Sequence, residues 1–479
     1  MKETATSGKI LVNGMWIDIP TTTPVINPAC HQETVGRVAC CDKKDVFNAV
    51  SAATTALEDW ATTDPENRAA RIRAAAGALA DCTTSLIKLF VKESGKTLSE
   101  AERDIQRAIK VMEMVASELP AWSAPKLIEK EQSVWLRKRA RGVTAVISPW
   151  NSPVFLSFRR FVPAIGGGNT VVLKPASYCP LTVLECFRII QPYFPAGVLN
   201  LITGKGEKVG EALVTDHRIA TISFTGGTET GRSIIQASAS TVKKLLLELG
   251  GNDPAVVLKD AILSDENIRR MTQSILRSAG QVCIAIKRIY VHASRQKELL
   301  EKLASSFEQI VVGDPLHKET TMGPLNNKDQ FSFVNGLLEN ARQSGLEVRT
   351  LGRKLDPDSW ATGFFLLPSI IVNARQGDEI TRCEQFGPVI PIIPFDDNEE
   401  AVDWANDTDY GLRASVWTSD RYEAERLAQL IQAGAIFHNN HGIFQDLHIE
   451  FPGLKQSGLS AESRHLGLDH FSDAYGLAD

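Results

Sequence analysis

Residues 142–153 read Gly-Val-Thr-Ala-Val-Ile-Ser-Pro-Trp-Asn-Ser-Pro, a short apolar run that stops at a turn flanked by two prolines. The same pattern of apolar run, turn and helical segment returns at Thr170–Leu173, Leu199–Ile202 and Ala220–Phe224. Short apolar strands that alternate with helices predict a parallel sheet with helices on both faces. Ligands of such sheets bind beyond the carboxyl ends of the strands, so the turns after these runs are candidate sites.

The rest of the chain predicts an α/β protein with more than one domain. Its 479 residues, 43% of them hydrophobic, are enough for two or three domains. A second strand–helix series runs from Ala255 to about Phe437, and Trp122–Arg141 resembles a β-ribbon. The last residues, 472–479, are short enough to pair as an edge strand elsewhere in an assembly. Helical patterns cover Lys43–Glu58, Glu66–Ala80, Thr83–Ser94 and Ser99–Ser117.

Charge and cysteine usage argue against several classes of protein. The net charge is −5 with acidic and basic residues interspersed, so we expect no nucleic-acid partner. No apolar run reaches the ~18–20 residues that span a bilayer, and the polar start Met1–Ser7 lacks the apolar core of a signal peptide. The eight cysteines form no CxxC pair and no zinc-like spacing with histidine, so we expect no metal and a reduced, cytoplasmic location.

Three residues suit acyl chemistry, and each also has an ordinary structural interpretation. Cys283 lies in Ser278–Ala285, between a helical and a strand-like segment, where a thiol can meet an electrophile; a buried core cysteine is the alternative. Glu248 closes an apolar run before two glycines, which favours a partly desolvated general base; a solvated helix end is the alternative. Asn151 can donate to an oxyanion or belong simply to its turn.

Two further features suit a nucleotide. Thr225–Gly231 is a glycine-rich turn into a helix, whose backbone N–H groups and dipole can hold a phosphate. Glycine-rich turns are common and this one is not GxGxxG, so the signal is weak by itself. Lys174, at a strand end, can reach a ribose hydroxyl or a phosphate; a solvated lysine is the alternative.

Seven motifs in order along the chain resemble the aldehyde dehydrogenase superfamily. They are Pro149–Pro153, Gly168–Pro175, Phe224–Thr228, Glu248–Gly251, Gly280–Cys283, Glu384–Val389 and Lys455–Gly458. Together they cover nearly the whole chain, so the resemblance is highly specific.

The resemblance implies a role for each candidate residue. Cys283 would attack the aldehyde carbon as a thiolate and form a thiohemiacetal, while Asn151 and the Cys283 backbone N–H would hold the oxyanion. Hydride transfer to the nicotinamide would leave a thioester, and Glu248 would activate the water that hydrolyses it. The implied cofactor-binding residues are Ile147, Ser148, Pro149, Trp150, Lys174, Ser177, Gly206, Gly210, Phe224, Thr225, Gly226, Gly227, Glu229, Leu249, Gly250, Glu384 and Phe386.

Departures from the family pattern bear on the cofactor and the substrate. Ser177 stands where the family often has a glutamate that would repel a 2′-phosphate, so the chain resembles members that accept NADP as well as NAD. Arg159 and Arg277 resemble succinate-semialdehyde dehydrogenases, which have arginine at both positions, and two guanidinium groups suit a carboxylate. Structural ion pairs are the alternative role for these arginines, and a neutral aldehyde is the alternative substrate. Phe155 and Ile284 would line the same substrate tunnel.

The family architecture implies three parts and a homodimer or homotetramer. Residues 1–121 and 142–250 would form a dinucleotide-binding domain, 251–455 a catalytic domain, and 122–141 with 456–479 an oligomerisation ribbon and tail. Two other functions remain open at this point: a coenzyme A-acylating enzyme, against which Glu248 argues, and a non-catalytic scaffold on the same fold. His438, His441 and His448 lie close in sequence, and we interpret them as solvated loop residues.

Overall fold

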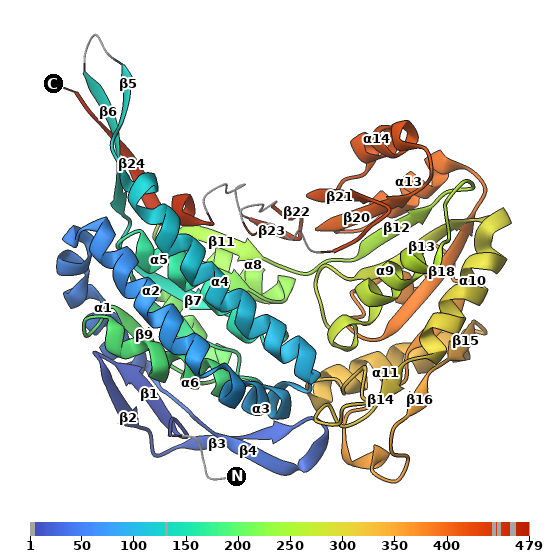
Figure 1. The fold of residues 1–479 in the computed structure, drawn as a ribbon, viewed down its shortest axis with the longest axis horizontal. Helices are drawn as coiled ribbons and strands as arrows, with labels where there is room; N and C mark the ends of the chain where they lie inside the picture. The colour runs from blue at the N-terminus through green and yellow to red at the C-terminus, as the bar shows by residue number, and fades with distance from the viewer. Residues whose placement is uncertain (1–4, 130–132, 443–446, 448–451, 460–465, 479) are drawn as a thin grey trace.

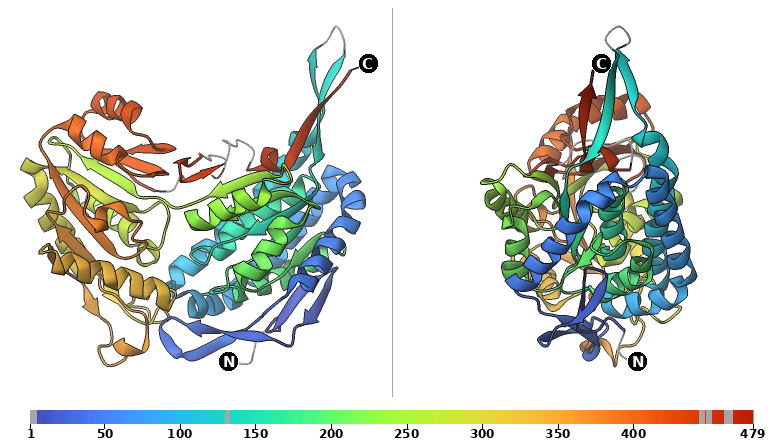
Figure 2. Two further views of the ribbon diagram at one scale, coloured as in Figure 1. Left: turned by 180° about the vertical axis from the view of Figure 1, so that it is seen from behind. Right: turned by 90° about the vertical axis from the view of Figure 1, so that its left-hand side faces the viewer.

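The computed structural model describes residues 5–129, 133–442, 447, 452–459 and 466–478. Two α/β lobes lie side by side, each built on its own sheet, and a three-stranded arm projects from the first lobe (Figure 1). The further views show the same arm extending beyond the body of that lobe (Figure 2). This arrangement confirms the predicted α/β fold with two doubly wound sheets and a ribbon.

The first sheet has the strand order β2-β1-β9-β8-β7-β10-β11-β23. Its central strands, which all run parallel, are β9 (Leu199–Leu201), β8 (Thr170–Lys174), β7 (Val143–Ile147), β10 (Ile219–Thr225) and β11 (Lys244–Glu248). Antiparallel edges are added by β1 (Lys9–Val12) with β2 (Met15–Asp18), and by β23 (Gly458–Leu459). The five parallel strands therefore end on one common edge.

Successive residues of these strands feed two hydrophobic cores, one on each face of the sheet. Val143 and Ala145 belong to one core, whereas Val146 belongs to the other. The first core includes α1 (Lys43–Thr62), α7 (Glu211–Thr215) and α8 (Thr228–Ser238). The second includes α2 (Pro65–Asp81), α3 (Thr83–Ser94), α4 (Leu98–Ser123), α5 (Pro153–Gly166) and α6 (Leu181–Ile190).

The second sheet is parallel except at one edge. Its strands, in spatial order, are β15 (Glu347–Thr350), β17 (Ser369–Val372), β18 (Val389–Phe395), β13 (Ile286–His292), β12 (Asp253–Val257), β20 (Arg413–Trp417) and β21 (Ala435–His438), and only β15 is antiparallel. Its helices are α9 (Asp265–Leu276), α10 (Ala293–Glu308), α11 (Lys328–Gln343), α12 (Glu379–Arg382), α13 (Asn398–Asn406) and α14 (Arg421–Leu430). The remaining strands are β3 (Thr22–Asn27), β4 (Cys30–Ala39), β14 (Val311–Val312), β16 (Arg353–Lys354), β19 (Tyr410–Gly411) and β22 (Leu454–Lys455).

The arm consists of β5 (Lys126–Glu129), β6 (Val134–Ala140) and β24 (Ser472–Leu477). The C-terminal strand β24 pairs with β6 of its own chain, and so differs from the expectation that it pairs elsewhere in an assembly. Asn169 explains this, because its amide donates to the Phe471 carbonyl at 2.8 Å and fixes the chain just before β24.

One predicted boundary shifts at the base of the arm. The helix expected to stop at Ser117 continues as α4 to Ser123, so Trp122 belongs to this helix and not to the ribbon. Trp122 is buried, and its indole N–H donates to Asp469 at 2.8 Å. This contact with a residue far along the sequence extends the helix, which a local pattern does not reveal. The division of the chain into three functional parts stays a prediction.

Candidate active site

The residues predicted to bind a cofactor lie along the edge where the five parallel strands end. Ile147 closes β7, Lys174 closes β8, and Phe224 and Thr225 close β10. The others in the first lobe follow these strands: Ser148, Pro149, Trp150, Ser177, Gly206, Gly210, Gly226, Gly227, Leu249 and Gly250. The second lobe brings Glu384 and Phe386 to the same region.

Two contacts show that these residues of the second lobe reach the first. The Phe386 ring lies edge-on to Trp150, with ring centroids 5.4 Å apart. Glu384 accepts a hydrogen bond from the Gly251 N–H at 3.1 Å, just after β11. The predicted cofactor residues of both lobes therefore meet.

The ends of β8 and β10 fit a nucleotide. Lys174 is buried, and among the described residues its ammonium has one hydrogen-bond acceptor, the Pro175 carbonyl at 3.4 Å. Burial lowers the pKa of Lys174 to about 8. A buried ammonium with unused donors favours a hydroxyl or phosphate oxygen beside it. Gly227 precedes the N-terminus of α8, and a Cβ at Gly227 would meet open space, so backbone N–H groups are accessible there.

Cys283 lies on a loop whose backbone is held in an uncommon conformation. Ser278 and Ala279 have positive φ of 51° and 55°, a region that costs residues with a Cβ about 1–3 kcal/mol each. Glu100 on α4 accepts from the Ser278 N–H at 2.6 Å, and Lys96 donates to the Ser278 hydroxyl at 2.8 Å. These contacts stabilise the turn that presents Cys283. The loop is thus shaped by the first lobe as well as by its own sequence.

Position 280 on the same loop requires a glycine, because of its backbone conformation and its close neighbours. Its φ is 74°, and a Cβ there would overlap the carbonyl oxygen of Gly387. The side chain of Gln281 bonds the loop further, donating to the Ser278 carbonyl at 2.8 Å and accepting from the Asn326 N–H at 2.9 Å. We define residues 278–285 as the nucleophile loop.

Cys283, Asn151 and Glu248 line one cavity of about 210 Å³. The Asn151 side-chain amide donates to the Gln281 carbonyl at 2.9 Å, and a Glu248 oxygen lies 3.5 Å from an Arg160 nitrogen. Glu248 ends strand β11, so the alternative that it ends a helix was wrong. Burial raises the pKa of the Cys283 thiol to about 12. The three residues predicted to carry the chemistry are together, as the proposed mechanism needs.

The cavity also contains an acid that the sequence analysis missed. Asp104 of α4 is buried, and its carboxylate accepts from the Ser152 hydroxyl and from the Phe155 N–H at 2.7 Å. Burial raises the pKa of Asp104. Because Ser152 and Phe155 begin α5, Asp104 caps this helix from outside and fixes the segment that carries Asn151. A helical acid far from the motif gives no local signal of this contact.

Six arginines line the same cavity: Arg103 and Arg107 from α4, Arg159 and Arg160 from α5, Arg277 just after α9, and Arg413 from β20. Arg159 and Arg277 are the two that were predicted from the sequence. Burial, together with the charges of Arg159, Arg277 and Arg103, lowers the pKa of Arg107 to about 10, although Asp104 opposes this shift. Arg103 and Arg107 are four residues apart and so share one face of a helix. This spacing is the sequence signal from which the pair could have been predicted.

The arginines differ in their contacts. The Arg107 guanidinium lies over the Phe155 ring, 3.7 Å from its centroid. Arg159 donates to the Leu447 carbonyl at 3.1 Å and has other contacts. Within the described residues, no carboxylate lies at ion-pair distance from Arg107 or Arg277. Phe155 and Ile284, the predicted tunnel residues, line the same cavity.

Some predicted residues lie away from this cavity. The Glu229 side chain is largely exposed and pairs with Arg232 at 2.5 Å on α8. His438 is exposed at the end of β21, and its Nε2 lies 3.0 Å from the Thr418 carbonyl, which accepts. The interpretation of His441 as solvated was wrong, because it is buried beside Asp253. His448 lies outside the described residues. Among the residues that the structure describes, no three His, Cys, Asp or Glu side chains gather as a metal site would need.

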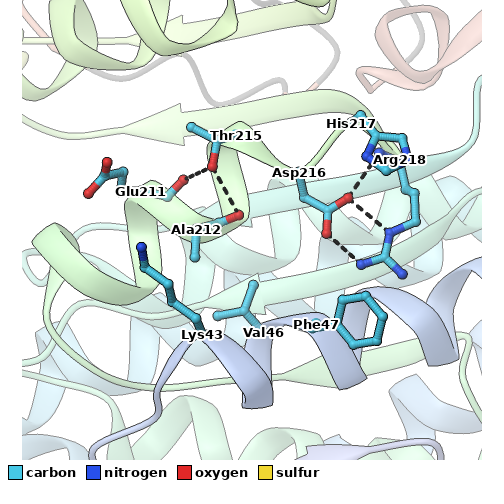
Figure 3. A pocket seen from close by; sticks show the side chains of 9 residues that line it. All are labelled: Lys43, Val46, Phe47, Glu211, Ala212, Thr215, Asp216, His217 and Arg218. Atoms are coloured by element: carbon cyan, nitrogen blue, oxygen red, sulfur yellow. Dashed lines mark hydrogen bonds and ion pairs between the residues drawn. The ribbon is translucent and has the colours of Figure 1, made fainter.

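A larger, open hollow of about 390 Å³ lies on the outside of the first lobe, between α1 and α7 (Figure 3). Asp216 and Arg218 form an ion pair at its rim at 2.6 Å, and the Arg218 guanidinium lies 4.5 Å from the centre of the Phe47 ring. None of the predicted site residues lines it. The cavity at Cys283, though smaller, holds the groups that suit chemistry.

In the described part of the chain, no single helix is long and apolar enough to cross a membrane, and α2 with α3 passes that test only as a pair bent by 71°.

The fold and this site define a dinucleotide-linked α/β dehydrogenase. The model of the aldehyde dehydrogenase family matches residues 16–475, and the chain belongs to this family. It is an NAD(P)-dependent aldehyde dehydrogenase.

Relatives of known name and structure agree with this assignment. The chain is 32% identical over 474 residues to 3,6-anhydro-alpha-L-galactose dehydrogenase of Vibrio sp. strain EJY3, covering 97% of each chain. It is 34% identical to the peroxisomal aminoaldehyde dehydrogenase 2 of Pisum sativum, covering 97% of this chain and 94% of the relative.

Two solved structures have the same fold. Betaine aldehyde dehydrogenase of Staphylococcus aureus with NAD+ has a TM-score of 0.93 and 29% identity, covering 98% of this chain and 95% of the other. A 3,6-anhydro-L-galactose dehydrogenase with NADP has a TM-score of 0.93 and 32% identity, covering 98% and 99%.

Proposed function

We propose that this enzyme oxidises an aldehyde that also carries a carboxylate, such as a semialdehyde, through a thioester on Cys283. The observation that supports this substrate class is the arginine cluster of Arg103, Arg107, Arg159 and Arg277 in the cavity of Cys283. Guanidinium groups bind carboxylates with paired, charge-assisted hydrogen bonds.

Within this cluster, Arg107 and Arg277 are the pair best placed to bind the substrate carboxylate. Neither has a carboxylate partner within the described residues, whereas Arg159 already contacts the Leu447 carbonyl. Asp104 and Glu100 attract these two guanidinium groups only from beyond ion-pair distance. A buried cation whose charge is only partly balanced is costly, so an anionic substrate relieves this cost on binding. Phe155, under Arg107, and Ile284 offer apolar contacts for the carbon chain between the two ends of the substrate.

The charge of the cavity also separates this enzyme from two classes of relative. Betaine aldehyde carries a permanent positive charge, and aminoaldehydes carry an ammonium. The six arginines and Lys96 of the cavity outnumber its three carboxylates, Glu100, Asp104 and Glu248, so the excess of positive charge would repel both. A neutral aldehyde, as the relatives named for anhydrogalactose act on, is the alternative substrate. The Phe155 ring in the cavity favours an aromatic member of that class.

In the proposed reaction Cys283 is the nucleophile, Asn151 holds the oxyanion and Glu248 is the general base. The Cys283 thiolate adds to the aldehyde carbon, and the oxygen that becomes negative accepts from Asn151 and the Cys283 N–H. Bound NAD(P)+ supplies the acceptor for the hydride that leaves this carbon. Glu248 then takes a proton from water as the water attacks the thioester, which breaks the C–S bond and returns the Cys283 thiolate.

Glu248 supports hydrolysis over transfer of the acyl group to coenzyme A, because a carboxylate in the cavity can activate water beside Cys283.

We further propose a cytoplasmic homodimer or homotetramer, joined through the arm of β5, β6 and β24. Leu127, Ile128 and Leu477 on this arm are exposed and apolar, which favours a contact between copies. Light scattering of the purified protein tests this assembly, and a monomer would contradict it.

The test of the substrate class compares succinate semialdehyde with butanal, a neutral aldehyde of equal carbon number. Arg107→Met and Arg277→Met should each lower kcat/KM for the semialdehyde at least about tenfold, the effect of ~1.4 kcal/mol, and leave that for butanal within about threefold. Arg269→Met, an exposed arginine on α9, is the matched control. Equal losses on both aldehydes, or no loss on either, would overturn the proposed substrate class.

A further inference from the structure

Lys287 is a buried lysine four residues after Cys283, at the start of β13. Its ammonium turns back into the nucleophile loop and donates to the carbonyl oxygens of Val282 at 3.0 Å, Cys283 at 2.6 Å and Ala285 at 3.4 Å. One side chain thus holds three carbonyl groups around the predicted nucleophile. No sequence motif in the seven used above includes this lysine.

The same ammonium faces the cofactor side of the site. Its nitrogen lies 3.8 Å from a Glu384 oxygen, and that oxygen also accepts from the Gly251 N–H at 3.1 Å. The side chains of Lys287 and Glu384 are 3% and 18% exposed, so solvent screens this pair little. Lys287 therefore connects the nucleophile loop to Glu384, one of the predicted cofactor-binding residues.

The charges around the Cys283 thiol make Lys287 the main group that favours the thiolate. Burial raises the pKa of the thiol, and the carboxylates of Glu384, Glu248 and Asp253 raise it further, whereas Lys287 lowers it. One of these carboxylates has a cation of its own, since Arg160 lies 3.5 Å from Glu248. The histidine beside Asp253, His441 at 3.5 Å, adds no positive charge, because burial lowers its pKa. Loss of Lys287 would leave the thiol among acids, without the charge that opposes them.

We propose that Lys287 is a positioning residue that fixes the nucleophile loop against Glu384 and supplies the positive charge that stabilises the Cys283 thiolate. The inference rests on the proposed role of Cys283 and goes beyond the proposed substrate. Lys287 acts through Cys283 and need not contact the aldehyde.

The test measures the alkylation rate of Cys283 by iodoacetamide against pH, without cofactor, by mass spectrometry of the Cys283 peptide. This readout separates Cys283 from the other seven cysteines. Because the pKa of the Cys283 thiol is raised to about 12, the alkylation rates are compared between about pH 7 and pH 9, where they follow the small fraction of thiolate. In Lys287→Met alkylation should be about tenfold slower or more at each pH in this range. Lys287→Arg, which keeps the charge, should retain most of the wild-type profile.

Lys297→Met is the control, because Lys297 is an exposed lysine of α10 with a side chain 91% exposed. Its alkylation profile should match that of the wild type. An alkylation rate in Lys287→Met within about twofold of the wild type across this pH range would overturn the charge role. Should Lys287→Met fail to fold, Lys287→Gln replaces it, and an unchanged alkylation rate in that variant overturns the proposal equally.

Failure of this inference differs from failure of the proposed function. If Cys283→Ser still oxidises aldehydes, the proposed mechanism fails, and the alkylation profile of Lys287→Met is irrelevant to that result. If Cys283→Ser is inactive and the profile of Lys287→Met is unchanged, only the role of Lys287 is wrong.

Discussion

The Asn151 side-chain nitrogen donates a hydrogen bond of 2.9 Å to the carbonyl of Gln281, two residues before Cys283. A side-chain amide has two N–H groups, so one remains for the oxygen of a bound aldehyde while the other holds the nucleophile loop. Asp104 fixes this geometry from the other side, because it bonds Ser152 and the start of α5. The donor and the nucleophile are therefore set relative to each other before substrate binds.

Asn151→Ala should lower kcat about 10²–10³-fold, because one oxyanion donor is lost in a site held in place beforehand. Steady-state kinetics on one aldehyde measures this change. Asn340→Ala is the control and should match the wild type, because Asn340 is an exposed residue of α11 whose amide donates to the side chain of Glu379. A loss smaller than about threefold would show that Asn151 does not hold the oxyanion.

Glu248→Gln should slow hydrolysis of the thioester more than its formation, since the amide cannot take a proton from water. Rapid mixing with excess aldehyde should then show a burst of about one equivalent of reduced cofactor per active site, followed by a slow steady rate. The exposed Glu301→Gln provides a comparison and should show no such change. A slow rate without a burst would place Glu248 before the thioester and contradict its proposed role.

Ser177→Glu should turn the enzyme toward NAD. The Ser177 hydroxyl already donates to the Gly204 carbonyl at 3.1 Å, and Lys205 follows directly, so a 2′-phosphate would meet a hydroxyl and a nearby cation. A carboxylate at 177 would repel that phosphate and lower kcat/KM for NADP at least about tenfold relative to NAD. Ser85→Glu, on the exposed surface of α3, is the control. In the wild type, an NAD preference above about 100-fold, or ~2.7 kcal/mol, would refute the prediction that NADP is accepted.

NADP binding should weaken as pH rises through about 8. Burial lowers the pKa of Lys174 from 10.5 to about 8, so above this pH the free enzyme must take up a proton before the ammonium can hold an anion. The dissociation constant measured by fluorescence titration should then rise up to about tenfold per pH unit, and Lys174→Met should abolish this dependence. Lys110→Met, on the exposed side of α4, should keep it.

The lowered pKa of Lys174 also predicts how the free energy of unfolding changes with pH. Between pH 8 and 10.5 the unfolded chain holds a proton on Lys174 that the folded chain has released. The contribution of Lys174 to the free energy of unfolding therefore rises with pH in this window. Denaturant unfolding of the wild type and Lys174→Met without cofactor, compared across the window, measures it. A wild-type stability that falls more steeply than that of Lys174→Met would contradict the assignment.

The sequence by itself determined the parallel strands, the turns at their carboxyl ends, and the family. It also predicted Cys283, Asn151 and Glu248 as the reacting groups, because each stands in a short motif that resembles the family. The strand register then brings the three together, since parallel strands end on one edge and the second lobe supplies the nucleophile loop to that edge.

Only the tertiary structure decided which charges surround these residues. Arg107 and Asp104 lie on a helix with an ordinary amphipathic pattern, and packing of α4 against α5 turns them into the cavity. The contacts of Lys287 also depend on the tertiary structure, because its ammonium bonds the nucleophile loop that precedes its own strand and lies beside Glu384. Local patterns specify which face of an element is buried. They do not specify which polar groups of distant segments come into contact there. In a site of low dielectric, the electrostatic interactions between those groups are strong and determine which reactions the site can carry out.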